Sequence, residues 1–131
     1  AFDASKKMIE IASSETQVNW WVADFKSFRA AKQYDGIWAN FSLLHAPKKE
    51  MSQLIRTIFK SLKPHGLFSL GLKLGTGEKR DKIGRQYSYF EEHEIRNILL
   101  KEEFYPISHH LGEAKGLDGE SAKFIIILSH A

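Results

Sequence analysis

Apolar and polar residues follow two different periods along the chain, and the switches between them divide it into helices and strands. The clearest helix covers Lys48–Leu62, where apolar side chains recur at the i, i+3, i+4 spacing of a half-buried helix. Weaker helical patterns cover Ala4–Ser14 and Glu91–Glu102. Short apolar or β-prone runs predict five strands: Val18–Val22, Tyr34–Ala39, Leu67–Leu74, Phe104–Leu111 and Ala122–Ser129.

The order of these elements predicts the fold class. Helices and strands alternate through most of the chain, which indicates parallel βαβ units, whereas the last two strands follow each other directly and predict an antiparallel hairpin. The segment Gly75–Gln86 is polar, charged and punctuated by glycine, so we expect a loop there. No repeat or domain boundary interrupts the pattern. The sequence predicts one α/β unit over residues 1–131.

Composition narrows the class of protein. With 43% hydrophobic and 27% charged residues, the chain can bury a core. The longest apolar run, Phe124–Leu128, is too short to span a bilayer, so we expect no membrane partner. The absence of cysteine excludes disulfides and thiolate chemistry, and it favours a cytoplasmic location. The net charge of +3 is too small to indicate a nucleic-acid partner by itself.

Several segments taken together resemble one family. The opening AFDASKKMIEIAS reads as a strand that closes on an acidic residue and leads into a helix, and VADFKSF reads as the close of the next strand. The pair SLLHAP and LKPHG, within residues 34–73, is the most specific part. These segments resemble class I S-adenosylmethionine-dependent methyltransferases over essentially the whole chain.

The resemblance implies a Rossmann-like, mostly parallel sheet with a C-terminal antiparallel hairpin. On this interpretation residues 1–131 form a partial methyltransferase domain, from the end of the second strand to the last strand. The first strand and helix and the glycine-rich cofactor loop are then lacking. Gly75-Thr76-Gly77 does not replace that loop, because charged residues rather than a helix start follow it.

In the family, S-adenosyl-L-methionine binds at the carboxyl ends of successive strands. The resemblance assigns Asp3 to the ribose hydroxyls, Asp24 and Phe25 to the adenine, and Asn40 with Phe41 to the methionine part. The full set of implied cofactor contacts is Asp3, Ala4, Ala23, Asp24, Phe25, Asn40 and Phe41. Taken alone, Asp3 also fits a helix N-cap, Asp24 a turn residue, and the two phenylalanines core packing.

The acceptor side is expected to be a small molecule. His45 lies just past a strand and fits a general base, although a structural histidine is the common alternative. We expect Lys73, Arg85 and Tyr87 to contact the substrate, where the cations would meet a carboxylate or phosphate. After the fourth strand the sequence reads Asn-Phe-Ser-Leu, which lacks the motif of DNA amino-methyltransferases.

Other classes of function remain open from the sequence. An NAD-dependent oxidoreductase would also place an acid at Asp3, but the closing hairpin argues against it. An RNA methyltransferase or binding module could use the basic and aromatic residues of segment 79–90, although acids are interleaved with them. A catalytically silent scaffold is the third alternative. Because a missing central strand leaves open edges, we also expect the fragment to self-associate.

Overall fold

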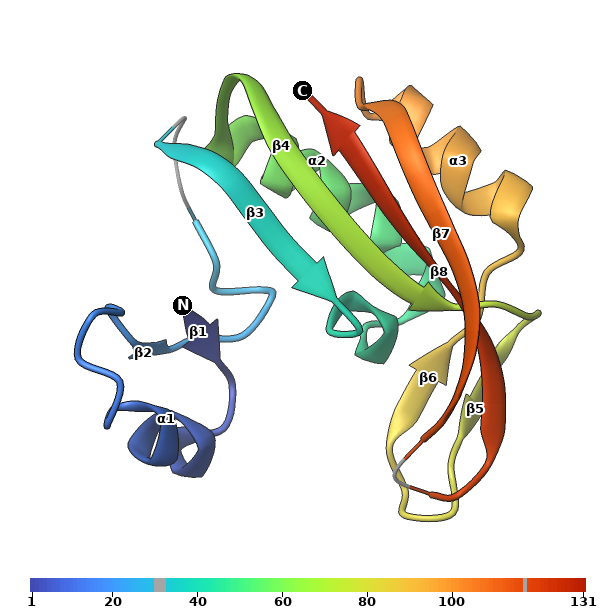
Figure 1. Ribbon diagram of the computed structural model, residues 1–131, viewed down its shortest axis with the longest axis horizontal. Helices are drawn as coiled ribbons and strands as arrows, with labels where there is room; N and C mark the ends of the chain where they lie inside the picture. The colour runs from blue at the N-terminus through green and yellow to red at the C-terminus, as the bar shows by residue number, and fades with distance from the viewer. Residues whose placement is uncertain (30–32, 117) are drawn as a thin grey trace.

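The computed structural model describes residues 1–29, 33–116 and 118–131. Its central sheet holds four strands in the spatial order β3 (Tyr34–Asn40), β4 (Leu62–Lys73), β8 (Ser121–His130) and β7 (Tyr105–Lys115). β3 and β4 run parallel, and β8 is antiparallel to both of its neighbours (Figure 1). The predicted combination of a parallel pair with a closing antiparallel hairpin is therefore confirmed.

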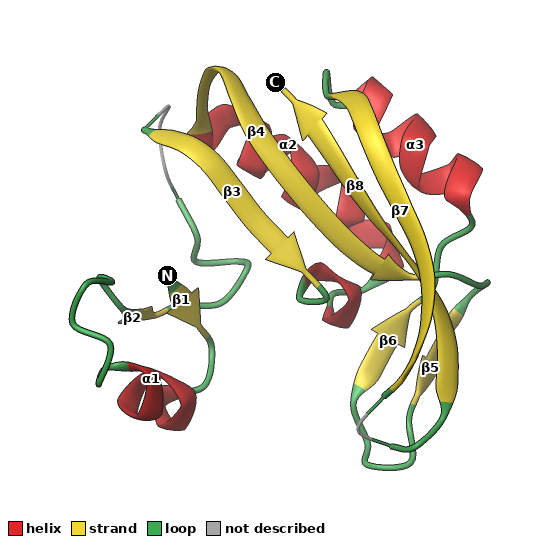
Figure 2. Cartoon of the chain, viewed as in Figure 1, coloured by secondary structure: helices red, strands yellow, loops and turns green. Residues whose placement is uncertain are grey.

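Two helices cover one face of this sheet, α2 (Met51–Ser61) and α3 (Glu92–Lys101) (Figure 2). The apolar positions of α2 fall on one side and are buried, and every second residue of β4 points toward them. The buried side chains at this interface include Met51, Ile55, Phe68, Leu70, Leu72, Ile95 and Leu99. A reciprocal capping box between Glu91 and Glu94 begins α3. None of the described helices is long and apolar enough to cross a membrane.

The N-terminal residues form a separate small unit. β1 (Phe2–Asp3) pairs in parallel with β2 (Trp21–Val22), and α1 (Lys6–Ala12) connects them. This pair belongs to a different sheet from β3, and Figure 1 shows it beyond the outer edge of β3. The strand predicted over Val18–Val22 is shorter than expected, because only its last two residues pair.

The prediction of a loop over Gly75–Gln86 is wrong in part, since most of a β-hairpin lies there. β5 (Glu78–Arg80) pairs antiparallel with β6 (Gln86–Ser88). Glu78 Oε1 accepts hydrogen bonds from the Lys48 backbone N–H at 2.7 Å and the Ser88 hydroxyl at 3.0 Å, which anchor the hairpin. The Lys48 bond is the main reason that the pKa of Glu78 is lowered. Polar composition concealed the hairpin because its side chains pair with each other and with the loop before α2.

Other predicted boundaries shift by a few residues. β4 begins at Leu62, directly after α2, so the Pro64-His65-Gly66 corner lies inside the strand rather than before it. A 3-10 helix, Lys48–Glu50, forms the first turn of the helix predicted from Lys48. β7 extends to Lys115, beyond the predicted end at Leu111, because its pairing with β8 continues to the turn.

Candidate functional site

Asp3 and Asp24 lie at neighbouring carboxyl ends of parallel strands. Asp3 pairs with Val22, and the Ala23 N–H donates to the Asp3 carbonyl at 3.1 Å. This pairing places Ala4 next to Ala23, just beyond the strand ends. The arrangement is the one in which ligands bind to parallel α/β sheets.

Each of these carboxylates also makes a local hydrogen bond. Asp3 Oδ1 accepts the Ser5 N–H at 2.7 Å, while Ser5 itself is the N-cap of α1. The second Asp3 oxygen makes no hydrogen bond with the described residues, so it remains available. Asp24 Oδ1 accepts the Ser27 N–H at 2.7 Å, as expected for a turn residue, and hydrogen bonds from Ser27 lower the Asp24 pKa.

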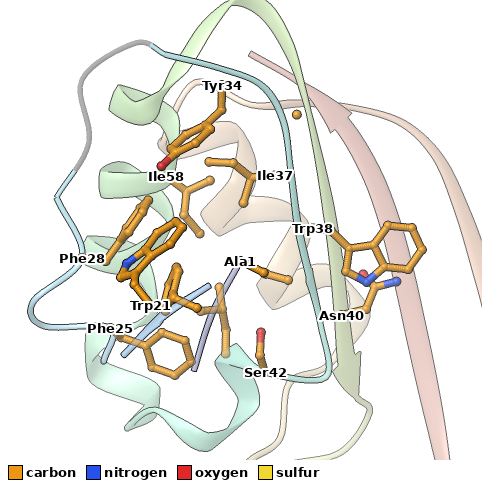
Figure 3. Close-up of a pocket in the computed structure, with 14 residues that line it drawn as sticks. Ala1, Trp21, Phe25, Phe28, Tyr34, Ile37, Trp38, Asn40, Ser42 and Ile58 are labelled. Carbon is orange, nitrogen blue, oxygen red and sulfur yellow. The ribbon is translucent and has the colours of Figure 1, made fainter. Parts of the chain in front are cut away.

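An apolar cavity of about 460 Å³ lies between this N-terminal unit and the edge of β3. Figure 3 shows aromatic side chains gathered on one side of β3, while Trp38 and Asn40 project from its other side. Phe25 and Asn40 line the cavity, as do Phe2, Trp21, Phe28, Tyr34, Ile37, Ser42 and Ile58. Asp3, Ala4, Ala23 and Asp24 do not line it, which leaves their assignment to the cofactor a proposal.

The end of β3 forms a wall between two cavities. Asn40 and Ser42 line the first cavity, whereas Phe41 lines a second one. Phe41 has a φ of 60°, which is uncommon for a bulky residue, and its N–H donates to the Gly71 carbonyl at 2.9 Å. The Ser69 hydroxyl donates to Asn40 Oδ1 at 2.9 Å. Backbone strain of this kind is characteristic of functional sites.

The second cavity, also about 460 Å³, brings together all four residues expected on the acceptor side: His45, Lys73, Arg85 and Tyr87. They come from three elements that are distant in sequence: the turn after β3, the end of β4, and the β5–β6 hairpin. The remaining lining residues are Phe41, Leu44, Ala114, Lys115, Gly116, Ala122 and Phe124. None of these described lining residues carries a carboxylate.

The hydrogen bond of His45 fixes its neutral tautomer. Nδ1 lies 2.8 Å from the Gln86 carbonyl oxygen, which can only accept, so Nδ1 carries the proton. Nε2 of the neutral imidazole then has a free lone pair. The ring centre lies 4.7 Å from that of Tyr87, and the side chain is exposed. His45 is therefore exposed at the cavity, with no described hydrogen bond to Nε2, rather than buried in the core.

Tyr87 lines the second cavity, and two cations lie close to its ring. Its ring is 5% exposed, and burial raises the pKa of its hydroxyl. Lys73 Nζ lies 4.1 Å from the ring centre and Arg85 Cζ 5.3 Å, which are cation–π distances. Arg85 Nη2 also lies 2.7 Å from Asp81 Oδ2, and hydrogen bonding to Asp81 raises the Arg85 pKa.

Sequence reasoning missed Phe124 as a site residue. Its ring meets Phe41 edge-on, with centres 5.4 Å apart. It lies across Gly112 on β7, where an added Cβ would be 2.4 Å from the Phe124 ring. In the sequence, Phe124 is marked only by its place near the start of a predicted strand. That it lies opposite Lys73 depends on the register between β4 and β8, which apolar spacing does not reveal.

Comparison with models of known protein families identifies the family of this chain. The model of the methyltransferase domain family matches residues 1–66, half of the sequence. The chain therefore belongs to the methyltransferase domain family. A search of the curated proteins gives no match.

Solved structures share the fold at low sequence identity. A methyltransferase from Methanosarcina mazei, described as S-adenosylmethionine-dependent, superposes with a TM-score of 0.81 and 16% identity, covering 98% of this chain and 79% of that one. The 1,6-didemethyltoxoflavin-N1-methyltransferase of Burkholderia thailandensis superposes with a TM-score of 0.79 and 18% identity, covering 99% of this chain and 59% of that one. The N-methyltransferase NodS of Bradyrhizobium japonicum superposes with a TM-score of 0.69 and 16% identity, covering 98% of this chain and 64% of that one. The chain thus has the methyltransferase fold and spans less than two thirds of the last two proteins.

Proposed function

We propose that this chain takes part in S-adenosylmethionine-dependent methyl transfer to a small-molecule acceptor. The observation that carries the proposal is the pair of cavities on either side of Phe41, at the carboxyl end of β3. One cavity adjoins the strand ends of Asp3 and Asp24, and the other contains an oriented histidine. Two related folds were crystallised with S-adenosylhomocysteine, one of them together with its small-molecule substrate.

The residues present fit the cofactor on chemical grounds. The uncommitted oxygen of Asp3 offers an acceptor for ribose hydroxyls, and Phe25 offers an apolar wall for a purine ring. The Asn40 side chain projects from the other side of β3 (Figure 3) and bonds to Ser69, so Asn40 would meet the methionine end with its backbone, at the end of the strand that lines the cavity. Bound there, S-adenosylmethionine would supply an electrophilic methyl group. We propose that residues 1–131 contribute this part of a methyltransferase domain.

The chain's own residues would position the acceptor and remove its proton. His45 Nε2 would accept a proton from an acceptor O–H or N–H, because Nδ1 is already bonded to Gln86. Phe41 and Phe124 would hold the acceptor against the dividing wall. Alignment of this kind is the main requirement of an in-line displacement.

The contacts favour a small molecule over RNA. Tyr87 is buried rather than exposed for base stacking, and two cations of segment 79–90 are neutralised, since Lys82 pairs with Glu120 and Arg85 with Asp81. A phosphate-tracking surface needs free cations in a row.

The proposal is tested by incubating the protein with methyl-labelled S-adenosylmethionine and either a panel of small acceptors or RNA. We expect label in small molecules. We also expect the His45→Gln variant to be slower by about 10²-fold or more. Label that appears only in RNA would refute the acceptor class, and an unchanged rate in the variant would refute the base.

A further inference from the structure

The second cavity combines an apolar lining with uncompensated positive charge. Three cations line it, Lys73, Arg85 and Lys115, and no described lining residue is acidic. Arg85 is offset by Asp81, whose carboxylate lies 2.7 Å away. Lys73 forms no ion pair with any described residue, and its ammonium group lies 4.1 Å from the Tyr87 ring centre. Of the three lining cations, Lys73 and Lys115 therefore lack an ion pair with any described residue.

A half-buried ammonium without a carboxylate partner is costly unless a ligand neutralises it. Arg85 adds donor capacity, because Nη2 is buried and has no aligned hydrogen-bond partner among the described residues. Both cations line the same cavity, and their charged groups lie 4.1 Å and 5.3 Å from the Tyr87 ring centre, so an anion bound in this cavity would be attracted by both.

The rest of the lining selects for a flat, apolar body. Phe41 and Phe124 meet edge-on, and Leu44, Ala114 and Ala122 fill the spaces between the polar groups. A volume of about 460 Å³ is in the range of small-molecule sites. We propose that this cavity binds a small planar carboxylate, with the carboxylate near Lys73 and Arg85 and the ring packed against the contacting side chains of Phe41 and Phe124.

The idea that this acid is the methyl acceptor rests on the proposed function, whereas the preference of the cavity for an anion does not depend on it. The chain offers a matched control, because Lys79 Nζ lies 5.0 Å from the Tyr89 ring centre without lining this cavity. Lys73→Gln and Lys79→Gln thus each remove one cation from one tyrosine ring. Lys73→Arg keeps the charge, and circular dichroism confirms that each variant folds.

The experiment titrates the full chain with benzoate and with its neutral analogue benzamide, followed by saturation-transfer NMR. We expect benzoate to bind about tenfold or more tightly than benzamide. The preference should vanish in Lys73→Gln and persist in Lys79→Gln and Lys73→Arg. Equal binding of the two probes, or a preference that survives in Lys73→Gln, would overturn the proposal, and so would tighter binding of phenyl phosphate than of benzoate. A separate titration with S-adenosylhomocysteine distinguishes the failures: benzoate selectivity without S-adenosylhomocysteine binding supports the carboxylate site and refutes methyl transfer.

Discussion

At the scale of single residues, the wall between the two cavities depends on a close approach of two backbones. A Cβ added to Gly71 would lie 3.0 Å from Asn40 Cα and 3.2 Å from the Phe41 nitrogen. Only glycine lets β4 run this close to the end of β3 without moving it. The position of Phe41, and with it the shape of both cavities, therefore rests on a residue that lines neither.

We predict that Gly71→Ala lowers the free energy of unfolding by about 1–3 kcal/mol, because backbone atoms must shift. Gly36→Ala is the control on the adjacent strand, where the added Cβ would meet its nearest atom at an ordinary 3.5 Å. Urea denaturation of the two variants measures the difference. Equal stabilities would show that the approach of the strands is not constraining.

At the scale of elements, a buried carboxylate links α2 to the end of α3. Glu102 accepts from Arg56 Nε at 2.6 Å and from the Ser52 hydroxyl, and its side chain is 2% exposed. The hydrogen bond from Arg56 lowers the pKa of Glu102 although burial opposes it. A depressed folded-state pKa contributes stability above the unfolded value, near 4.5, that is lost as the pH falls through the folded value.

We therefore expect Glu102→Gln to cost about 1–3 kcal/mol at neutral pH. This deficit should shrink on acidification below about pH 4.5, because the carboxylate becomes protonated first in the unfolded chain and then, at lower pH, in the folded protein. Glu103→Gln, at the exposed neighbouring position, should show no such pH dependence. Thermal unfolding across the pH range provides the measurement, and a deficit that is constant with pH would contradict the assignment.

Among the elements, those with a sustained apolar pattern could be predicted from the sequence. Those that depend on hydrogen bonds between distant segments were missed. α2 and the closing hairpin follow from apolar spacing alone. The β5–β6 hairpin was missed because β5 has three exposed residues and depends on Glu78 bonding to a distant turn. At the site, the sequence predicted His45 from its position just past a strand and Lys73 as a substrate contact, whereas Phe124 required the register of β8 against β4.

At the scale of the whole molecule, β3 is an edge strand, and no described strand pairs with its outer side. The Phe41 N–H points to β4, and backbone groups alternate along a strand, so the N–H and C=O groups of Trp38 and Asn40 point away from it. The apolar first cavity adjoins this edge, and Trp38 is 79% exposed. Open apolar edges pair readily with another chain.

We predict that the 131-residue chain self-associates by pairing β3 with the same strand of a second copy. Trp38→Lys should shift it toward the monomer, because charge on an edge strand disfavours pairing. Leu100→Lys, at an exposed apolar position on α3, is the matched control. Multi-angle light scattering decides the question, and a monomeric wild-type chain would contradict the prediction.

We propose that this methyltransferase-family chain binds S-adenosylmethionine through the strand ends beside Asp3. Calorimetric titration of S-adenosylhomocysteine into the wild-type protein and the Asp3→Ala variant tests it most directly. We predict measurable binding to the wild type and a loss of about 1–3 kcal/mol in the variant, since a ribose acceptor is removed. Circular dichroism confirms that the variant retains α1. No binding to either protein, or equal affinity for both, would contradict the account.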